Sequence, residues 1–383
     1  MTPKPTSTHS LTDDTQKLAD AAWMARALIL AHRGVAQAHP NPMVGAVIVK
    51  NDHVVGEGFH IYESRHHAEI VALDRAQGDA RGATLYVNLE PCCHTGRTGP
   101  CTQAIIQARM RRAVVAMKDP NPAVAGRGIR ALQKAGIEVR VGVHEGEAKR
   151  LNESFAKWIR TKLPFVTLKT ALTLDGRIAA HADSTTWITS PESREEVQRI
   201  RHASDALLTG IGTVLIDDPR MSDRTGLPRR KPLLRVILDS KLRMPLSSQI
   251  VKSAKNDVLI FTASSATSSK ARALQRAGIE IVKVSSCSGG LDLRAILREL
   301  GRREILSLLI EAGAQLNGAV LSAGIVDKMI LFYAPRVLGG GVPMAELPSR
   351  ALAKIPPLSN LSFRQFGPDF MLEGYFHDVY RNH

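Results

Sequence analysis

One histidine, one glutamate and two cysteines constrain the fold of this chain more than any other feature. His67 and Glu69 are separated by one residue, Cys92 follows Pro91, and eight residues separate Cys92 from Cys101. One imidazole and two thiolates are ligands that zinc prefers, and a catalytic zinc with three protein ligands leaves its fourth position to water. We therefore expect the fold to bring His67, Cys92 and Cys101 together around one Zn²⁺, with Glu69 beside them.

The order of these residues also indicates a reaction. Zinc lowers the pKa of a bound water to about 7, and a nearby carboxylate can pass a proton from that water to a departing amine. His-x-Glu followed by Pro-Cys-x-x-Cys is typical of zinc deaminases. The match is partial, because Thr95 stands where the second cysteine would fall and Cys101 is the next thiol after Cys93. We interpret Glu69 as the catalytic proton carrier.

Two other interpretations of the cysteines stay open. Cys93 competes as a ligand, although the side chains of adjacent residues diverge, which favours Cys92 with Cys101. The thiols could also be small buried hydrophobic groups. Cys287 has no companion and is expected to be structural. The chain has four cysteines, three of them within ten residues, which is not the pattern of a secreted disulfide framework. We therefore expect the protein in a reducing compartment, the cytoplasm.

Net charge and hydropathy limit the classes of ligand and partner that we expect for this protein. The chain has 383 residues and a formal net charge of +15, which favours phosphate-bearing ligands. The basic residues are scattered and form no nucleic-acid-binding arm. Residues 1–14 are polar and predict a disordered tail without a signal peptide. The most apolar early segment, 21–31, is too short to cross a bilayer and contains Arg26. We expect a small-molecule substrate, no nucleic acid and no membrane.

Hydrophobic periodicity predicts two α/β domains joined by a charged helix. The first domain is expected over residues 15–146, the linker helix over 147–163 and the second domain over 164–383. Expected helices are 15–32, 67–76, one from Cys101, 128–135, 191–201, 270–277, 292–300 and 315–323. Expected strands are a hairpin at 44–49 and 54–55, then 84–89, 113–117, 138–143, 166–169, 206–209, 233–238, 257–261, 305–310 and 327–332.

Glycine-bearing turns in the second domain suggest a nucleotide site only weakly. Gly210-Ile211-Gly212 follows a predicted strand, but Leu215 stands where a dinucleotide fingerprint needs its third glycine. Glu311-Ala312-Gly313 lies between a predicted strand and a predicted helix, whose first N–H groups could bind a pyrophosphate. A plain strand-to-helix turn explains the same residues equally well.

The stretch Pro-Cys-Cys-His-Thr-Gly-Arg-Thr-Gly-Pro-Cys at 91–101 resembles the P-C-x-H-x-G-[RK]-T-P-P-C motif of the bifunctional deaminase/reductases of riboflavin biosynthesis. Segments 41–45, 56–60, 119–122 and 126–128 are similar to the same family, although Gly99 replaces its usual proline. The resemblance implies a cytidine-deaminase-like N-terminal domain with zinc on His67, Cys92 and Cys101. Implied pyrimidine ribose phosphate contacts are Asn41, His60, His94, Arg97, Asp119 and Asn121. Asn41 and Asn121 could instead shape proline-adjacent turns.

The second half resembles the reductase domain of that family in segments 168–169, 174–177, 187–190, 212–214, 217–219 and 311–313. The resemblance implies a dihydrofolate-reductase-like α/β fold that binds NADPH. Implied substrate contacts are Lys169, Thr185, Thr189, Arg201, Arg224 and Glu311, with the two arginines suited to phosphate. Implied cofactor contacts are Ala171, Trp187, Thr213, Asp217, Ser240, Gly313, Ala314, Gln315, Leu316, Asn317, Gly318 and Ala319. Ala314 departs from the family's Pro or Gly, and Asp217 could instead form a structural ion pair.

The resemblance covers the chain from about Ala21 onward and implies two consecutive reactions. The first removes an amino group from a diaminopyrimidinone ribosylamino phosphate, and the second reduces the ribosyl chain with NADPH. We expect a homo-oligomer, either a dimer or a tetramer. A tRNA or nucleoside deaminase with an accessory domain is the alternative, although the Cys92–Cys101 spacing differs from Cys-x-x-Cys. A zinc-stapled structural scaffold is a third possibility.

Overall fold

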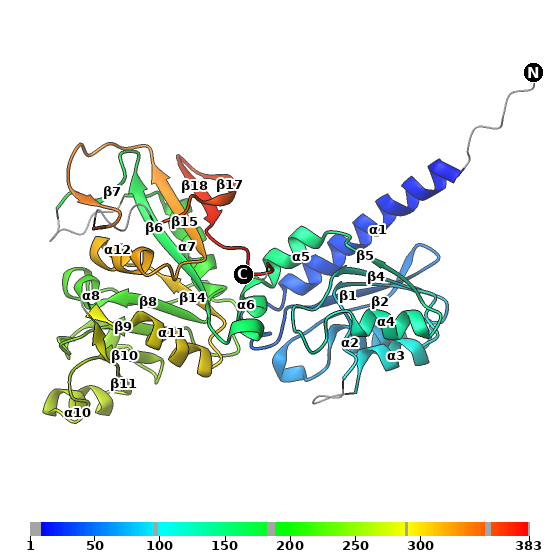
Figure 1. Ribbon diagram of the computed structural model, residues 1–383, viewed down its shortest axis with the longest axis horizontal. Coiled ribbons are helices and arrows are strands. Elements are labelled where there is room, and N and C mark those ends of the chain that lie inside the picture. Colours follow the sequence, from blue (N-terminus) through cyan, green and yellow to red (C-terminus); the bar gives the residue numbers. More distant parts are fainter. Residues whose placement is uncertain (1–8, 95–98, 182–187, 288–289, 349–353, 382–383) are drawn as a thin grey trace, which may run out of the picture. The chain divides into compact units, whose positions relative to one another are not determined.

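The computed structural model describes residues 9–94, 99–181, 188–287, 290–348 and 354–381 (Figure 1). The chain divides into two compact units, Met1–Arg160 and Thr161–His383. Each unit is built around its own β-sheet. Thr185, Trp187 and Arg97, which the sequence analysis assigns to binding sites, lie outside the described residues. No helix in the described ranges is both long and apolar enough to cross a membrane.

The first unit is a five-stranded sheet between two layers of helices, in the order β2-β1-β3-β4-β5. β1 is antiparallel to β2 and β3, whereas β3, β4 and β5 are parallel. Helices α1 and α5 lie over one face, and α2, α3 and α4 over the other (Figure 1). The elements are α1 His9–His32, β1 Gly45–Lys50, β2 His53–Phe59, α2 Ala68–Arg75, β3 Thr84–Leu89, α3 Cys101–Gln107, β4 Arg112–Met117, α4 Arg127–Lys134, β5 Glu138–Val141 and α5 Glu145–Leu151.

Close packing of α2 on β2 fixes where the metal-binding histidine lies. A Cβ atom on Gly56 would lie 2.1 Å from the carbonyl oxygen of Ala72, and one on Gly58 would lie 2.7 Å from that of Ala68. A Cβ atom cannot come this close to a carbonyl oxygen, so only glycine fits at these two positions. The two glycines therefore allow α2 to pack directly on β2. The first turn of α2, with His67 just before it, is thereby held over the sheet.

The second unit contains a nine-stranded sheet in the order β11-β10-β9-β8-β14-β6-β15-β18-β17. The seven strands from β11 to β15 are parallel, and β18 and β17 add an antiparallel edge. Its strands are β6 Phe165–Thr173, β8 Ala206–Gly210, β9 Leu234–Leu238, β10 Val258–Thr262, β11 Ile279–Lys283, β14 Ser307–Ile310, β15 Lys328–Ala334, β17 Ser359–Phe366 and β18 Asp369–Tyr375, and its main helices are α7 Pro191–His202, α8 Ile211–Asp217, α10 Ser269–Arg276, α11 Leu293–Arg302 and α12 Ala314–Ser322.

Helix α7 begins as the sequence predicts. Ser190 is its N-cap and accepts a hydrogen bond from Ser193 N at 3.3 Å, with Pro191 in the first turn. The buried carboxylate of Asp369 adds acceptors for Ser190 N at 2.7 Å and Ser193 Oγ at 2.6 Å. The start of α7 is therefore tied to strand β18, which fixes the position of the helix.

Two segment predictions are wrong. Helix α1 begins at His9, so residues 9–14 of the expected tail are helical; this stretch contains neither proline nor glycine, and Pro3 and Pro5 lie upstream of it. The expected linker helix 147–163 is two helices, α5 and α6 Glu153–Thr161. They separate at Asn152, whose φ of −110° and ψ of 19° leave the helical region. Its amide group binds the backbone of Met43 instead, at 2.8 Å and 3.0 Å.

Candidate active sites

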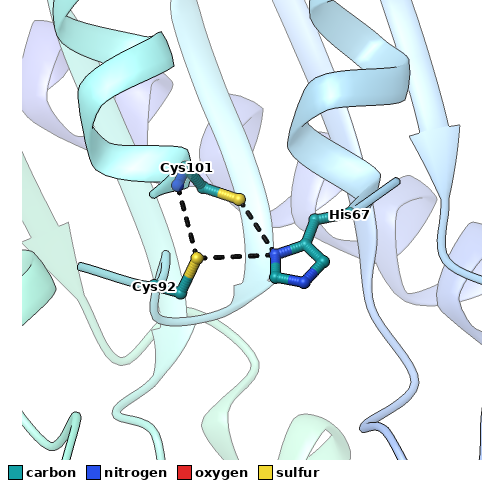
Figure 2. A group of neighbouring side chains, drawn as sticks. All are labelled: His67, Cys92 and Cys101. Atoms are coloured by element: carbon teal, nitrogen blue, oxygen red, sulfur yellow. Dashed lines mark hydrogen bonds between the residues drawn. The ribbon is translucent and has the colours of Figure 1, made fainter. Parts of the chain in front are cut away.

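Three segments of the first unit bring together the predicted metal ligands. His67 immediately precedes α2, Cys92 lies in the loop after β3, and Cys101 is the first residue of α3. The Nδ1 atom of His67 lies 3.1 Å from Cys101 Sγ and 3.5 Å from Cys92 Sγ, and Cys101 N lies 3.3 Å from Cys92 Sγ (Figure 2). All three ligand atoms lie within 4.8 Å of one another, and no other such group occurs among the described residues.

The donor set of this group fits a catalytic zinc. It offers one imidazole nitrogen and two sulfurs, which leaves room for a fourth ligand. Cys101 is buried, whereas His67 and Cys92 are partly exposed, so the group is reachable from outside. Within the group, hydrogen bonding from Cys101 outweighs burial and lowers the pKa of Cys92 to about 4. Hydrogen bonding to Cys92 and burial raise the pKa of Cys101, so the chain itself stabilises a thiolate at Cys92.

Glu69 lies in the first turn of α2 and is 3% exposed. Burial raises the pKa of its carboxyl group, while the positive charge of His67 acts in the opposite direction. A raised pKa makes a carboxyl group hold a proton more readily, which suits a group that has to accept a proton and release it again. The structure therefore places beside the ligand group the one residue type that a hydrolytic deamination requires of the protein.

Asn41 and His60 form a fixed pair next to this group. His60 is buried and its ring lies 5.7 Å from the ring of His67, edge to face. Its Nδ1 atom lies 2.8 Å from the carbonyl oxygen of His66, which can only accept, so Nδ1 carries the proton. Its Nε2 atom, 3.0 Å from Asn41 Nδ2, must then accept from the amide. His60 is thus engaged with the protein through both nitrogens and orients the Asn41 side chain.

The loop after β4 carries Asp119 and Asn121 and is held by Glu90. The buried Glu90 carboxylate accepts hydrogen bonds from Asp119 N at 3.1 Å, Gly126 N at 2.8 Å and Ile129 N at 3.1 Å. Asp119 Oδ1 accepts from Asn121 N at 2.8 Å, and burial raises the pKa of Asp119 to about 7. Asn121 Oδ1 accepts from Ala123 N at 3.0 Å, which supports the turn-shaping interpretation of Asn121. His94 is exposed.

The second unit has a cavity of about 450 Å³ beside α7 and the carboxyl ends of β6, β8 and β14. Eight of the expected reductase residues line it: Lys169, Ala171, Thr189, Arg201, Thr213, Asp217, Arg224 and Glu311. Ser240, after β9, and residues 313–319, at the start of α12, are not among the lining residues. Asn317 is fully buried and donates to Met344 O at 2.8 Å, so it packs inside the unit.

Three charged side chains form a largely buried ionic group in the cavity wall. Glu311 accepts from Arg201 Nε at 2.7 Å and Nη2 at 3.0 Å, and its Oε2 atom lies 3.5 Å from Lys169 Nζ. The three side chains are 12–17% exposed, and although this partial burial acts against ionisation, the charges of Lys169 and Arg201 lower the pKa of Glu311 to about 2. Burial lowers the pKa of Lys169. Glu311 is therefore an anion shared between two cations that face the cavity.

Sequence reasoning missed several residues of the sites. Thr209, the penultimate residue of β8, is fully buried and lines the cavity, and its hydroxyl has no hydrogen-bond partner within the described ranges. Glu90 was missed although it directly follows a fully buried strand. In both cases the signal was a polar residue at the carboxyl end of a buried strand. Arg194, Gln198, Arg220 and Ser222 also line the cavity, and no motif pointed to them.

Comparison with known proteins identifies the family to which each unit belongs. The family model "cytidine and deoxycytidylate deaminase zinc-binding region" matches residues 18–117, and "RibD C-terminal domain" matches residues 164–372. The riboflavin biosynthesis protein RibD of Escherichia coli is 41% identical over 92% of this chain and 98% of its own length. That of Aquifex aeolicus is 39% identical over 92% and 97%. The chain belongs to the RibD family.

Solved structures agree with that assignment over both units. RibD of Acinetobacter baumannii is similar with a TM-score of 0.83 and 38% identity, covering 94% of this chain and 99% of the other. A deaminase/reductase of Thermotoga maritima gives a TM-score of 0.80 and 35% identity over the same shares. The fold prediction is confirmed: a cytidine-deaminase-like unit precedes a dihydrofolate-reductase-like unit. The chain is a bifunctional enzyme of riboflavin biosynthesis, a zinc-dependent deaminase and an NADPH-dependent reductase.

Proposed function

We propose that the first unit deaminates 2,5-diamino-6-(5-phosphoribosylamino)pyrimidin-4(3H)-one to 5-amino-6-(5-phosphoribosylamino)uracil, consuming water and releasing ammonia. The second unit then reduces the ribosyl side chain to give 5-amino-6-(5-phosphoribitylamino)uracil. The observation that carries the proposal is the convergence of His67, Cys92 and Cys101 beside the buried Glu69. The printed name of the Thermotoga maritima structure describes the same two activities for that protein.

In the deaminase, His67 Nδ1 and the sulfurs of Cys92 and Cys101 would hold the metal. Zinc bound there supplies a water of lowered pKa. The Glu69 carboxyl group would accept a proton from the attacking water and deliver it to the departing amine, and its raised pKa suits this role. The fixed amide of Asn41 and the carboxyl of Asp119 are proposed to bind the pyrimidine, with His60 and Asn121 at family positions beside them. His94 and Arg97 are proposed for the phosphate.

In the reductase, the cations of the cavity are proposed to bind the substrate. Arg224 and Arg201 suit the phosphate because a guanidinium group binds two oxygens at once. Lys169 and Glu311 are proposed to position the ribosyl chain, and Thr185 and Thr189 are proposed as further substrate contacts. Positioning of donor and acceptor carbons is the main demand of hydride transfer, and NADPH supplies the hydride. The proposed cofactor contacts remain Ala171, Trp187, Thr213, Asp217, Ser240 and residues 313–319.

The setting of the enzyme is also a proposal. We place the boundary between the domains within residues 147–163 and the enzyme in the cytoplasm, where Cys92, Cys93 and Cys101, all free thiols, stay reduced. Family resemblance supports a dimer or tetramer. Light scattering would test the assembly, and a mass equal to the 41.7 kDa of one chain would contradict it.

The decisive assay supplies the diaminopyrimidinone phosphate and follows ammonia release and NADPH absorbance together. We expect ammonia release without NADPH, and equal amounts of ammonia and oxidised NADPH when NADPH is present. Deamination of tRNA with none of the free pyrimidine would instead support a nucleic-acid editor. Loss of folding in Glu69→Gln would support the structural-scaffold hypothesis, since Glu69 is not a proposed ligand.

A further inference from the structure

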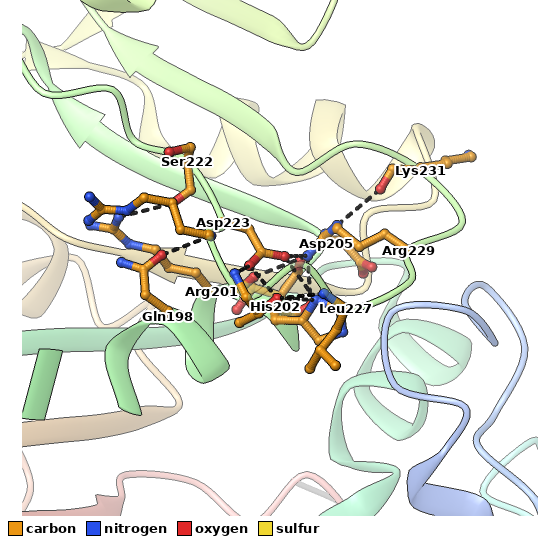
Figure 3. A network of polar contacts seen from close by, with 12 residues as sticks. Gln198, Arg201, His202, Asp205, Ser222, Asp223, Leu227, Arg229 and Lys231 are labelled. Carbon is orange, nitrogen blue, oxygen red and sulfur yellow. Dashed lines mark hydrogen bonds and ion pairs between the residues drawn. The ribbon is translucent and has the colours of Figure 1, made fainter. Parts of the chain in front are cut away.

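The segment 222–225, which follows α8, lies at the border of the reductase cavity, and its side chains point alternately toward the cavity and away from it. Ser222 and Arg224 line the cavity, whereas Asp223 between them does not. The Asp223 side chain is 7% exposed and turns toward the end of α7 (Figure 3). Arg224 is exposed at the cavity edge. A buried carboxylate thus lies directly behind the residue proposed to meet the substrate phosphate.

Asp223 is the centre of a compact polar network. Its Oδ2 atom accepts from His202 Nδ1 at 2.8 Å and from Arg229 Nη1 at 3.1 Å. Its Oδ1 atom accepts from the backbone N of Thr225 at 2.9 Å and from its hydroxyl at 2.8 Å. Both oxygens are therefore used, and the pKa of Asp223 is lowered by these hydrogen bonds although burial opposes them.

Arg229 connects this network to the end of α7. It donates to the carbonyl oxygens of His202 at 2.7 Å and Ser204 at 2.8 Å, with a longer contact of 3.4 Å to that of Arg201. The last carbonyls of a helix have no partner within the helix, so a guanidinium group there satisfies them and opposes the helix dipole. Arg229 also pairs with the Asp223 carboxylate. This one ion pair therefore holds both the end of α7, which Arg229 caps, and the segment 222–225.

Helix α7 also holds the segment from the cavity side. Gln198 Oε1 accepts from Arg224 N at 3.0 Å, and Arg201 Nη1 donates to Ser222 O at 3.2 Å. The same Arg201 binds Glu311 in the cavity wall. The segment is thus fixed on two sides of one helix, by Gln198 and Arg201 toward the cavity and by His202 away from it.

We propose that Asp223, together with His202 and Arg229, is a positioning residue of the reductase, holding segment 222–225 on α7 so that Arg224 meets the substrate phosphate. The inference rests on the phosphate-binding role proposed above for Arg224. Asp223 touches neither substrate nor cofactor in this account. Its removal would leave the largely buried Arg229, whose side chain is 14% exposed, without its anion, and the segment would lose its anchor.

The test compares Asp223→Asn, Arg224→Ala and the double variant in the full-length enzyme. The deaminated ribosyl phosphate and NADPH are the substrates, and ammonia release from the diaminopyrimidinone phosphate reports on the other unit. We expect Asp223→Asn to raise the reductase KM for the phosphate substrate about tenfold, with little change in kcat or in KM for NADPH. In the Asp223→Asn background, Arg224→Ala should add less than about threefold, because Arg224 is already misplaced.

Two matched variants separate positioning from loss of stability. Asp327→Asn removes a carboxylate that is 4% exposed and accepts from Val166 N at 2.7 Å, away from the cavity lining. It should lower the melting temperature without changing KM. Thr225→Val removes one hydrogen bond from Asp223 and should raise KM by a smaller factor, which keeps the test available if Asp223→Asn does not fold.

The outcomes distinguish the positioning role of Asp223 from the phosphate-binding role of Arg224. If Arg224→Ala raises KM while Asp223→Asn and Thr225→Val do not, Asp223 has no positioning role. Additive effects of Asp223→Asn and Arg224→Ala would overturn it as well. If Arg224→Ala itself leaves KM unchanged, the proposed phosphate contact is wrong, and the proposed route by which Asp223 acts fails with it.

Discussion

The two active sites differ in how they accommodate buried polar groups. The deaminase gathers its ligands from residues 67 to 101, and these donors are arranged to share one metal ion. The reductase cavity draws on residues from 169 to 311, and its one shared carboxylate, Glu311, lies between two cations, Lys169 and Arg201, so a positive charge is left over for an anionic ligand. The first site therefore depends on an added ion, whereas the second depends on its internal ion pairs.

Removing a metal ligand should produce the largest contrast. Cys101→Ser takes away one of the two sulfurs, so we expect loss of zinc and loss of deamination while the reductase keeps its activity. The matched variant Cys93→Ser should keep about one zinc per chain. Metal analysis with both assays checks the pair. Zinc retained by Cys101→Ser and lost by Cys93→Ser would show that the wrong sulfur has been assigned.

Glu69→Gln removes the proton carrier but leaves the ligands in place. We expect deamination to fall by about 10³-fold, within the range for loss of a general acid–base group, while zinc content and reduction of the deaminated compound stay normal. Ammonia release and NADPH oxidation measure the two halves. Loss of both activities would contradict the independence of the sites.

Glu311→Gln tests the internal ion pairs of the second site. The change leaves Lys169 and Arg201, whose side chains are 12% and 16% exposed, without their shared anion. We expect the second unit to lose about 3 kcal/mol of stability and reductase kcat/KM to fall about 100-fold. Thermal unfolding and steady-state kinetics measure these effects. A variant with wild-type stability would show that the triad is not a compensated charge group.

Asp119→Asn should have the smallest effect and a distinctive pH dependence. Burial raises the pKa of Asp119 to about 7 from a model-peptide value of 3.8, so the folded protein favours its protonated form. Its contribution to stability is present below about pH 4 and is lost as the pH rises through about 7. The variant should therefore be more stable than the wild type at about pH 8, with the difference shrinking toward about pH 4. Unfolding curves across this range that run parallel would contradict the shifted pKa.

The contrast between a site built from nearby residues and a site built from distant ones also explains what the sequence could predict. His67, Glu69, Cys92 and Cys101 carry distinctive chemistry at short range, and the structure brings the three ligands together. Buried parallel strands such as β3 and β4, which read as apolar runs, were also predicted. Strands β17 and β18 were not predicted. Most of β17, which forms the edge of the sheet, is exposed, so its side chains do not follow the alternation that marks a half-buried strand.

Long-range polar contacts were beyond the sequence for a physical reason. Asp223 meets His202 across 21 residues, and Glu311 meets Arg201 across 110, and no local pattern records such pairings. Asn152 likewise breaks a predicted helix because of a contact with Met43, 109 residues earlier. Tertiary partners decide these positions, so sequence periodicity alone gives a continuous helix at 147–163 and no role for Asp223.

The most direct test of the account is a zinc-edge anomalous diffraction map of the metal-loaded enzyme. It should show one zinc per chain in the first unit, about 2.0–2.1 Å from Nδ1 of His67 and about 2.3 Å from the sulfurs of Cys92 and Cys101. Glu69 should lie beside the ion without binding it. A peak coordinated by Cys93, or no peak between these three side chains, would contradict the assignment of the deaminase site.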